Sequence, residues 1–178
     1  MRTVSILSDV PVDEIENLYL DYQSRTSVLL AKILCRKYWK IEPNLIDAFP
    51  GYEEKIKGRT AGLVIGDRVF TEDKKHQYVY DLGKAWKDFI GLPFTFALWV
   101  ANKRLPAEFQ ANFKRALGFG VENRIKALET YQGNIPKSEL VKYFKHRISY
   151  TFDSEKDKAF HKYIHLAEPF LKIDKVNG

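Results

Sequence analysis

Apolar residues follow two different patterns along the chain, and the change comes near residue 100. Before it, short apolar runs alternate with stretches of helical periodicity, which is typical of an α/β fold. The run Ala61–Ile65 is almost continuously apolar, as expected for a strand covered on both faces of its sheet. We expect strands of one mixed sheet system at Val4–Leu7, Leu18–Leu20, Leu45–Ala48, Leu63–Ile65, Tyr78–Tyr80 and Thr95–Val100.

Helical periodicity is strongest in Ser24–Trp39, where apolar residues recur at intervals of three and four. A shorter helix is expected at Gly83–Ile90, because Gly91 and Pro93 follow it. After residue 105 the pattern is helical throughout. We expect the last three helices at Pro106–Thr130, Lys137–Arg147 and Ser154–Lys172.

These patterns divide the chain into an α/β lobe at residues 1–100 and a C-terminal helical segment at residues 101–178. The helices of the second part carry broad apolar stripes, but no sheet within that part is expected to cover them. Either the helices bundle with one another, or the part of the fold that would cover them lies outside this chain.

Three hydroxyl residues and an arginine, Ser24, Arg25, Thr26 and Ser27, stand at the start of the strongest predicted helix. The first-turn amides of a helix lack intrahelical acceptors, and the helix dipole favours an anion at that end. The segment is therefore a candidate binding site for a carboxylate or a phosphate. The same residues also fit ordinary capping, with Ser24 as the N-cap.

Gly66 and Asp67 directly follow the buried strand Ala61–Ile65. Ligands of parallel α/β sheets gather beyond the carboxyl ends of the strands, so Asp67 either faces a substrate or caps a short helical turn. The sequence has neither a Gly-x-Gly-x-x-Gly fingerprint nor a phosphate loop ending in Gly-Lys-Ser/Thr, and so it lacks a standard nucleotide site.

Charge and composition exclude several other function classes. The net charge is +6, but the basic residues are dispersed, which argues against a nucleic-acid partner. Cys35 is the only cysteine, and His161 and His165 lack a third ligand in the zinc-helix pattern, so we expect no metal. No apolar run approaches the roughly 20 residues that span a bilayer, and the start of the sequence does not fit a signal peptide. We expect a cytoplasmic protein without a membrane partner.

Four segments together resemble the chorismate dehydratases of the futalosine route to menaquinone. These segments are Leu20–Ser27, Ala61–Asp67, Tyr80–Lys87 and Gly91–Trp99. Each motif is weak by itself, but the four occur in the same order and spacing as in that family across nearly the whole chain. The resemblance implies a fold like that of type II periplasmic binding proteins, in which a ligand cleft lies between two α/β lobes.

The resemblance also implies an activity. The family removes water from chorismate, a dicarboxylate, to give 3-[(1-carboxyvinyl)oxy]benzoate, and uses no metal or organic cofactor. Arg25, Thr26 and Ser27 would then bind and orient a substrate carboxylate, with Ser24, Gly66 and Asp67 also lining the site. The family places a hydroxyl residue on the strand that enters its second lobe, and Thr3 occupies that position, so we expect Thr3 to be catalytic.

One departure from the family concerns the start of the sequence. Family members begin with about half of the first lobe, including an early Asn of the catalytic cleft, whereas Met1–Thr3 already matches the crossing into the second lobe. We therefore expect a truncated or split gene product whose C-terminal helices would pack on the missing lobe. Exposed apolar helices would favour self-association or binding to a separately encoded N-terminal fragment.

Two other functions remain open. The sister synthase of the same pathway, which forms dihydroxynaphthoate, is expected to carry a His-Glu pair where this chain has Gly66 and Asp67. It is also expected to carry a Thr-Thr-Ala segment in place of Arg25–Ser27, and both departures argue against this synthase. The third interpretation is a non-catalytic or vestigial domain that binds a small anion.

Overall fold

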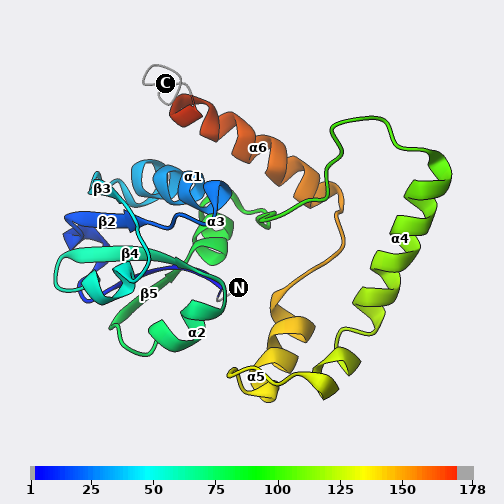
Figure 1. Ribbon diagram of the computed structural model, residues 1–178. Coiled ribbons are helices and arrows are strands. Elements are labelled where there is room, and N and C mark those ends of the chain that lie inside the picture. The colour runs from blue at the N-terminus through cyan, green and yellow to red at the C-terminus, as the bar shows by residue number, and fades with distance from the viewer. Residues whose placement is uncertain (1–2, 172–178) are drawn as a thin grey trace. The chain divides into compact units, whose positions relative to one another are not determined.

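A computed structural model describes residues 3–171, and the chain divides into two compact units. The sheet unit comprises Met1–Phe96 together with Phe152–Gly178, and the helical unit comprises Ala97–Thr151. The segment predicted at residues 101–178 is thus shared between the units. Its last helix, α6 (Ser154–Leu171), packs on the core of the sheet unit through Tyr163 and Ala167 (Figure 1).

Five strands form one mixed sheet in the order β3-β2-β4-β1-β5. β2, β3 and β4 run parallel, whereas β1 lies antiparallel between β4 and β5. The strands are β1 (Val4–Ser8), β2 (Asn17–Leu20), β3 (Asn44–Asp47), β4 (Thr60–Ile65) and β5 (Tyr78–Asp81). The α/β class and five of the six predicted strands are confirmed.

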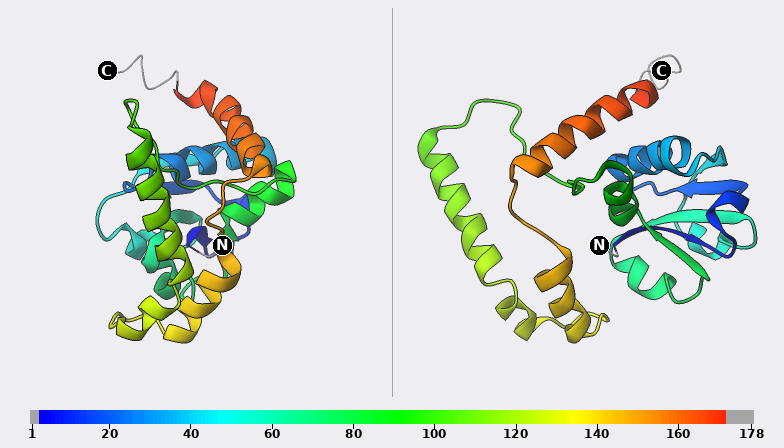
Figure 2. Two further views of the ribbon diagram at one scale, coloured as in Figure 1. Left: turned by 90° about the vertical axis from the view of Figure 1, so that its right-hand side faces the viewer. Right: turned by 180° about the vertical axis from the view of Figure 1, so that it is seen from behind.

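The larger core lies on the face of the sheet that carries the long helices (Figure 2). Side chains of α1 (Arg25–Ile33), α3 (Leu82–Ile90) and α6 meet there above β1, β2 and β4. Trp86 of α3 is completely buried and packs edge-to-face on Phe94 and Tyr163. The helix predicted at Ser24–Trp39 is present, since α1 continues into a wider helical turn at Leu34–Trp39.

A smaller core lies on the opposite face of the sheet. It joins the short helical turn η3 (Tyr52–Lys55) and the helix α2 (Val69–Glu72) to β1 and β4. Because helices cover both faces, all five residues of β1 are buried.

The strand predicted at Thr95–Val100 is wrong, because this segment is irregular. A strand needs a neighbour for its backbone hydrogen bonds, and no strand of the described residues runs beside this segment. Phe94 and Phe96 instead pack on the larger core, and Phe96 also lies close to Gly83 at the start of α3. Their aromatic side chains, which suggested a strand, serve as packing residues.

The helical unit contains no strand within residues 97–151. Its long predicted helix is interrupted: α4 (Ala107–Glu122) ends at Asn123, and a short helical turn follows at Lys126–Thr130. The backbone and side-chain amides of Asn123 both donate to the Phe119 carbonyl, at 3.0 Å and 2.9 Å, where the helix ends. The remaining helical part runs through α5 (Lys137–Lys142) and a wider turn at Tyr143–Arg147.

Candidate functional site

The strands β2 and β4 are parallel neighbours, but the helices that follow them lie on opposite faces of the sheet. β2 and β4 are paired in register, with Tyr19 opposite Gly62. After β2 the chain enters α1 on the face of the larger core, whereas after β4 it enters α2 on the other face. In α/β proteins, ligands bind beyond the carboxyl ends of strands that the chain leaves in this way.

The start of α1 lies on the β2 side of this edge and is capped as the sequence predicts. The Ser27 amide donates to Ser24 Oγ at 3.2 Å, and Ser24 Oγ donates to Ser27 Oγ at 3.0 Å. Ser27 is buried, so both its amide and its hydroxyl belong to the cap. Ser24 and Ser27 therefore hold the first turn of the helix in place.

Arg25 and Thr26 occupy the first two positions of α1. Within the described residues their amides have no hydrogen-bond acceptor, as expected at a helix start. The Arg25 side chain is exposed, whereas Thr26 is half-buried. The Thr26 carbonyl accepts a hydrogen bond of 3.1 Å from the Tyr163 hydroxyl of α6. The Tyr163 hydroxyl thus holds the backbone of this turn in place. Among the described residues, the amides of Arg25 and Thr26 and the Arg25 guanidinium have no bonded partner that would prevent them from binding a ligand.

Thr3, Gly66 and Asp67 meet on the β4 side of the same edge. The Gly66 amide donates a 2.8 Å hydrogen bond to the Thr3 carbonyl, one step beyond the Val4–Ile65 pair. Gly66 has φ of +75°, a backbone conformation that glycine adopts readily. Thr3 is half-buried and Asp67 is exposed.

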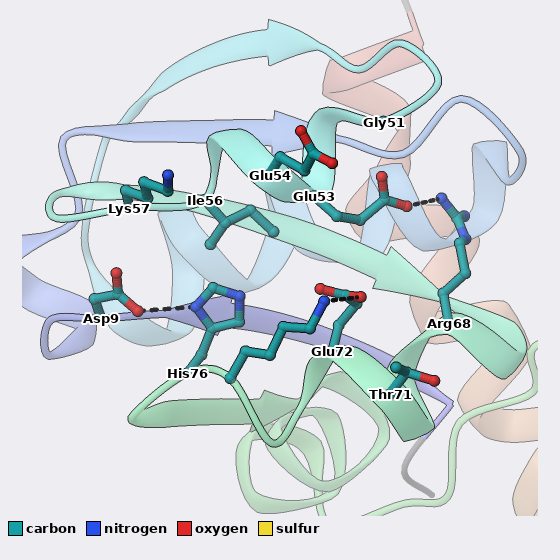
Figure 3. Close-up of a pocket in the computed structure, with 11 residues that line it drawn as sticks. Asp9, Gly51, Glu53, Glu54, Ile56, Lys57, Arg68, Thr71, Glu72 and His76 are labelled. Carbon is teal, nitrogen blue, oxygen red and sulfur yellow. Dashed lines mark hydrogen bonds and ion pairs between the residues drawn. The ribbon is translucent and has the colours of Figure 1, made fainter.

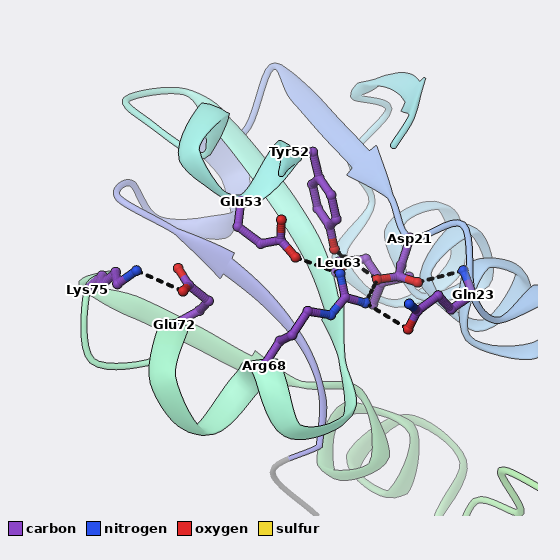
Figure 4. Close-up of polar contacts among 8 residues, drawn as sticks. All are labelled: Asp21, Gln23, Tyr52, Glu53, Leu63, Arg68, Glu72 and Lys75. Carbon is purple, nitrogen blue, oxygen red and sulfur yellow. Dashed lines mark hydrogen bonds and ion pairs between the residues drawn. The ribbon is translucent and has the colours of Figure 1, made fainter. Parts of the chain in front are cut away.

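The two sides are joined by a buried ion pair that sequence reasoning missed. The Asp21 carboxylate, fully buried just after β2, accepts hydrogen bonds from the Gln23 amide at 2.7 Å and the Tyr52 hydroxyl at 3.0 Å (Figure 4). It also pairs with Arg68, the residue after Asp67. Asp21 lies in one of the segments that carry the family resemblance, but nothing in the sequence pairs it with Arg68.

Burial and charge fix the protonation of the partners of Asp21. Burial raises the pKa of Tyr52 strongly, and the neighbouring Asp21 carboxylate raises it further, so the hydroxyl stays a donor. Partial burial works to lower the pKa of Arg68, but the hydrogen bond to Glu53 and the charge of Asp21 outweigh it and raise the pKa overall. Arg68 therefore remains a cation held between two carboxylates.

The sequence of the chain matches the model of a protein family described as menaquinone biosynthesis over residues 1–169. The chain belongs to this family. The match covers both units and all the candidate site residues, and it confirms the family resemblance found in the sequence. A role in menaquinone synthesis, as a biosynthetic enzyme, follows from membership.

This member of the menaquinone biosynthesis family also has a hollow of about 670 Å³ on the α2 side of the sheet (Figure 3). It is lined by Asp9, Gly51, Glu53, Glu54, Ile56, Lys57, Arg68, Thr71, Glu72, Lys75 and His76. None of the seven residues proposed from the sequence lines it. Several of its polar side chains contact one another. His76 Nδ1 lies 2.8 Å from the Asp9 carboxylate, Lys75 lies 2.7 Å from Glu72, and Arg68 lies 2.6 Å from Glu53.

Two further observations concern membrane-spanning helices and metal sites. Within residues 3–171, no helix is both long and apolar enough to cross a membrane. In the same residues, no three His, Cys, Asp or Glu side chains are grouped so that they could hold a metal ion. His161 instead lies 3.6 Å from the carboxylate of Asp157, one turn earlier in α6.

Proposed function

We propose that the chain is a hydro-lyase that dehydrates chorismate to 3-[(1-carboxyvinyl)oxy]benzoate. Its membership of the menaquinone biosynthesis family supports a step in this route. The observation that carries the proposal is the arrangement at the sheet edge, where the open first turn of α1 and the Thr3–Gly66 contact follow neighbouring strands. Such an edge suits a small dianion.

To catalyse this reaction, the protein has to bind the substrate and assist proton transfer. The ring hydroxyl of chorismate leaves with a proton as water, and the neighbouring ether-bearing carbon loses its hydrogen as a proton. The electron pair of that C–H bond completes the aromatic ring, so no oxidant or reductant is needed. The Thr3 hydroxyl is assigned to assist the departing water through a hydrogen bond.

A substrate carboxylate would bind at the first turn of α1. The amides of Arg25 and Thr26 are the available donors, because the Ser27 amide already bonds to Ser24. Arg25 adds a positive charge from an exposed position. Ser24 and Ser27 shape the turn, and Gly66 and Asp67 form the opposite side of the site.

A binding and turnover assay with chorismate tests the proposal. Product is detected by mass spectrometry as a species lighter by one water, together with the ultraviolet spectrum of an aromatic ring. Thr26→Leu adds bulk at the open turn and should abolish binding measured by calorimetry. Thr130→Leu, at an exposed position of the helical unit, is the matched control and should bind like the wild type.

The outcomes separate the functions that the sequence leaves open. Binding with aromatisation supports the dehydratase. Binding of chorismate without any product favours a non-catalytic domain that binds a small anion. An absence of chorismate binding by the wild type would overturn the proposal.

A further inference from the structure

The loops on the two sides of the candidate site belong to different strands, and side chains tie them together. The loop after β2 carries Asp21 and Gln23, and the loop after β4 carries Arg68. The guanidinium of Arg68 pairs with the buried Asp21 carboxylate and donates to the Gln23 side-chain oxygen at 3.2 Å. A third element joins through Glu53, whose carboxylate lies 2.6 Å from Arg68.

We propose that Arg68 is a positioning residue that holds the first turn of α1 in the geometry needed to bind a carboxylate. The inference rests on the proposed function for the identity of the ligand. Arg68 acts through Asp21 and Gln23, which immediately precede the helix cap at Ser24. Its own charge is matched by two protein carboxylates, so Arg68 supports the site without contacting the substrate.

The chemistry of the contacts requires arginine rather than any cation. Two carboxylates and an amide oxygen approach the planar guanidinium from different directions, which suits its fork of N–H donors. The guanidinium carbon also lies 5.8 Å from the ring centres of both Tyr22 and Tyr52, within reach of cation–π attraction. A lysine ammonium is a point charge that cannot reproduce this set of contacts.

Among the described residues, removal of Arg68 would leave the buried Asp21 carboxylate with only the Gln23 backbone amide and the Tyr52 hydroxyl as donors. A buried charge that loses its partner is strongly unfavourable. The Tyr52 hydroxyl cannot compensate fully, because its single proton is shared between the Asp21 carboxylate at 3.0 Å and the Leu63 carbonyl at 2.5 Å. The loop after β2 is therefore expected to shift so that Asp21 reaches water, and the first turn of α1 shifts with it.

The experiment compares Arg68→Gln and Arg68→Lys with Arg59→Gln in the full chain. Arg59 is the matched control, because it also pairs with two carboxylates, Glu14 and Glu16, but it is exposed and lies just before β4, at the opposite end of that strand from Arg68. Chorismate affinity is measured by calorimetry, KM and kcat by product formation, and hydrogen exchange at the amides of residues 23–28 by mass spectrometry without ligand.

Arg68→Gln should weaken chorismate binding and raise KM by roughly tenfold to a hundredfold, with a smaller change in kcat, since hydrogen bonds to a charged ligand group contribute about this much to affinity. Exchange at residues 23–28 should become faster. Arg68→Lys should show a smaller loss of affinity and a smaller increase in exchange than Arg68→Gln. It also replaces Arg68→Gln in the comparison if that variant does not fold. The double variant Asp21→Asn with Arg68→Gln should lose no more affinity than the worse single variant, because both act through one contact.

The failures of the two proposals are distinguishable. If the wild type binds chorismate and Arg68→Gln binds it equally well, the positioning role is overturned and the proposed function stands. If the wild type does not bind chorismate, the proposed function fails and the exchange measurement decides the positioning role. Faster exchange in Arg68→Gln but not in Arg59→Gln then supports it, and equal exchange in both overturns it.

Discussion

The backbone amide of Gly66 donates a 2.8 Å hydrogen bond to the carbonyl oxygen of Thr3. This bond extends the ladder between β1 and β4 by one step beyond Val4 and Ile65. It fixes the backbone of Thr3, the residue assigned to assist the departing water, against the turn that ends β4.

Replacing Thr3 with Val keeps the shape of the side chain and deletes its hydroxyl. If that hydroxyl assists the departing water, kcat for chorismate should fall by roughly a hundredfold, the lower range for loss of a proton-transfer group. The backbone bond to Gly66 does not involve the side chain and remains in the variant. Thr3→Ser restores the hydroxyl and should retain most activity. Unchanged turnover in Thr3→Val would remove Thr3 from the mechanism.

The left-handed backbone at Gly66 predicts an effect on stability. With φ at +75°, an alanine there is strained although the space around it is open, so Gly66→Ala should lower the free energy of unfolding by about 1 kcal/mol. Gly118 is the control, because it lies inside α4 with equally open space, and Gly118→Ala should stabilise by about 0.5–1 kcal/mol. Denaturant unfolding measures both. Shifts in the same direction would contradict the prediction.

Burial raises the pKa of the Cys35 thiol to about 12, from an ordinary value of 9.0. The thiol should therefore resist alkylation near pH 8 in the folded protein and react with one equivalent after denaturation, since it is the only cysteine. Because the folded pKa is the higher one, its contribution to stability is complete below pH 9 and is lost as the pH rises through about 12.

Cys35→Ala separates this effect from the alkaline titration of the tyrosines. In the variant, the free energy of unfolding should depend less steeply on pH between about 9 and 12 than in the wild type. Identical slopes for the two proteins, or alkylation of the folded wild type as fast as that of the denatured chain, would show that the thiol is accessible.

The helical unit carries exposed aromatic side chains that predict binding of a hydrophobic dye. Trp99 is 75% exposed and Phe119 is 69% exposed. Among the aromatic contacts of the described residues, Trp99 has one, an edge-to-face contact with Phe113 at 5.2 Å between the ring centres. Soluble monomers rarely expose large apolar patches, so we expect dye binding or self-association.

Substitution of the exposed aromatic residues tests whether they are the site of dye binding or self-association. Trp99→Ser together with Phe119→Ser should lower dye fluorescence and shift any dimer toward monomer in analytical ultracentrifugation. Phe49→Ser, which changes a half-exposed aromatic side chain of the sheet unit, is the control and should leave both readings unchanged. A wild-type chain that is monomeric and binds no dye would contradict the expectation.

Much of the fold could be predicted from local pattern alone. The strands β1, β2, β4 and β5 and the helices α1, α3 and α6 follow from periodicity, because each contributes apolar side chains to the cores of the sheet unit. The edge strand β3 is mostly exposed, and its short apolar run is enough to predict it. The segment Thr95–Val100 shows the limit of this reasoning. Its composition suits a strand, but a strand also needs a neighbour, and local sequence carries no information on whether one is available.

The candidate site was predictable only in its separate parts. Ser24 and Ser27 form the cap that their spacing indicates, because a cap is a contact between near neighbours in sequence. The Asp21–Arg68 ion pair joins residues 47 positions apart, and only the parallel pairing of β2 with β4 brings them together. Long-range polar contacts of this kind follow from topology, which a single sequence does not specify residue by residue.

The central place of β1 in the sheet sets an order for folding during translation. β1 is synthesised well before the two strands that flank it, so its edge toward β4 stays unpaired until residue 65 has been made, and its edge toward β5 until residue 81 has been made. Tyr163, which fixes Thr26 through its hydroxyl, arrives only after the whole helical unit has been made. Contacts this distant in sequence slow folding and leave strand edges open to aggregation.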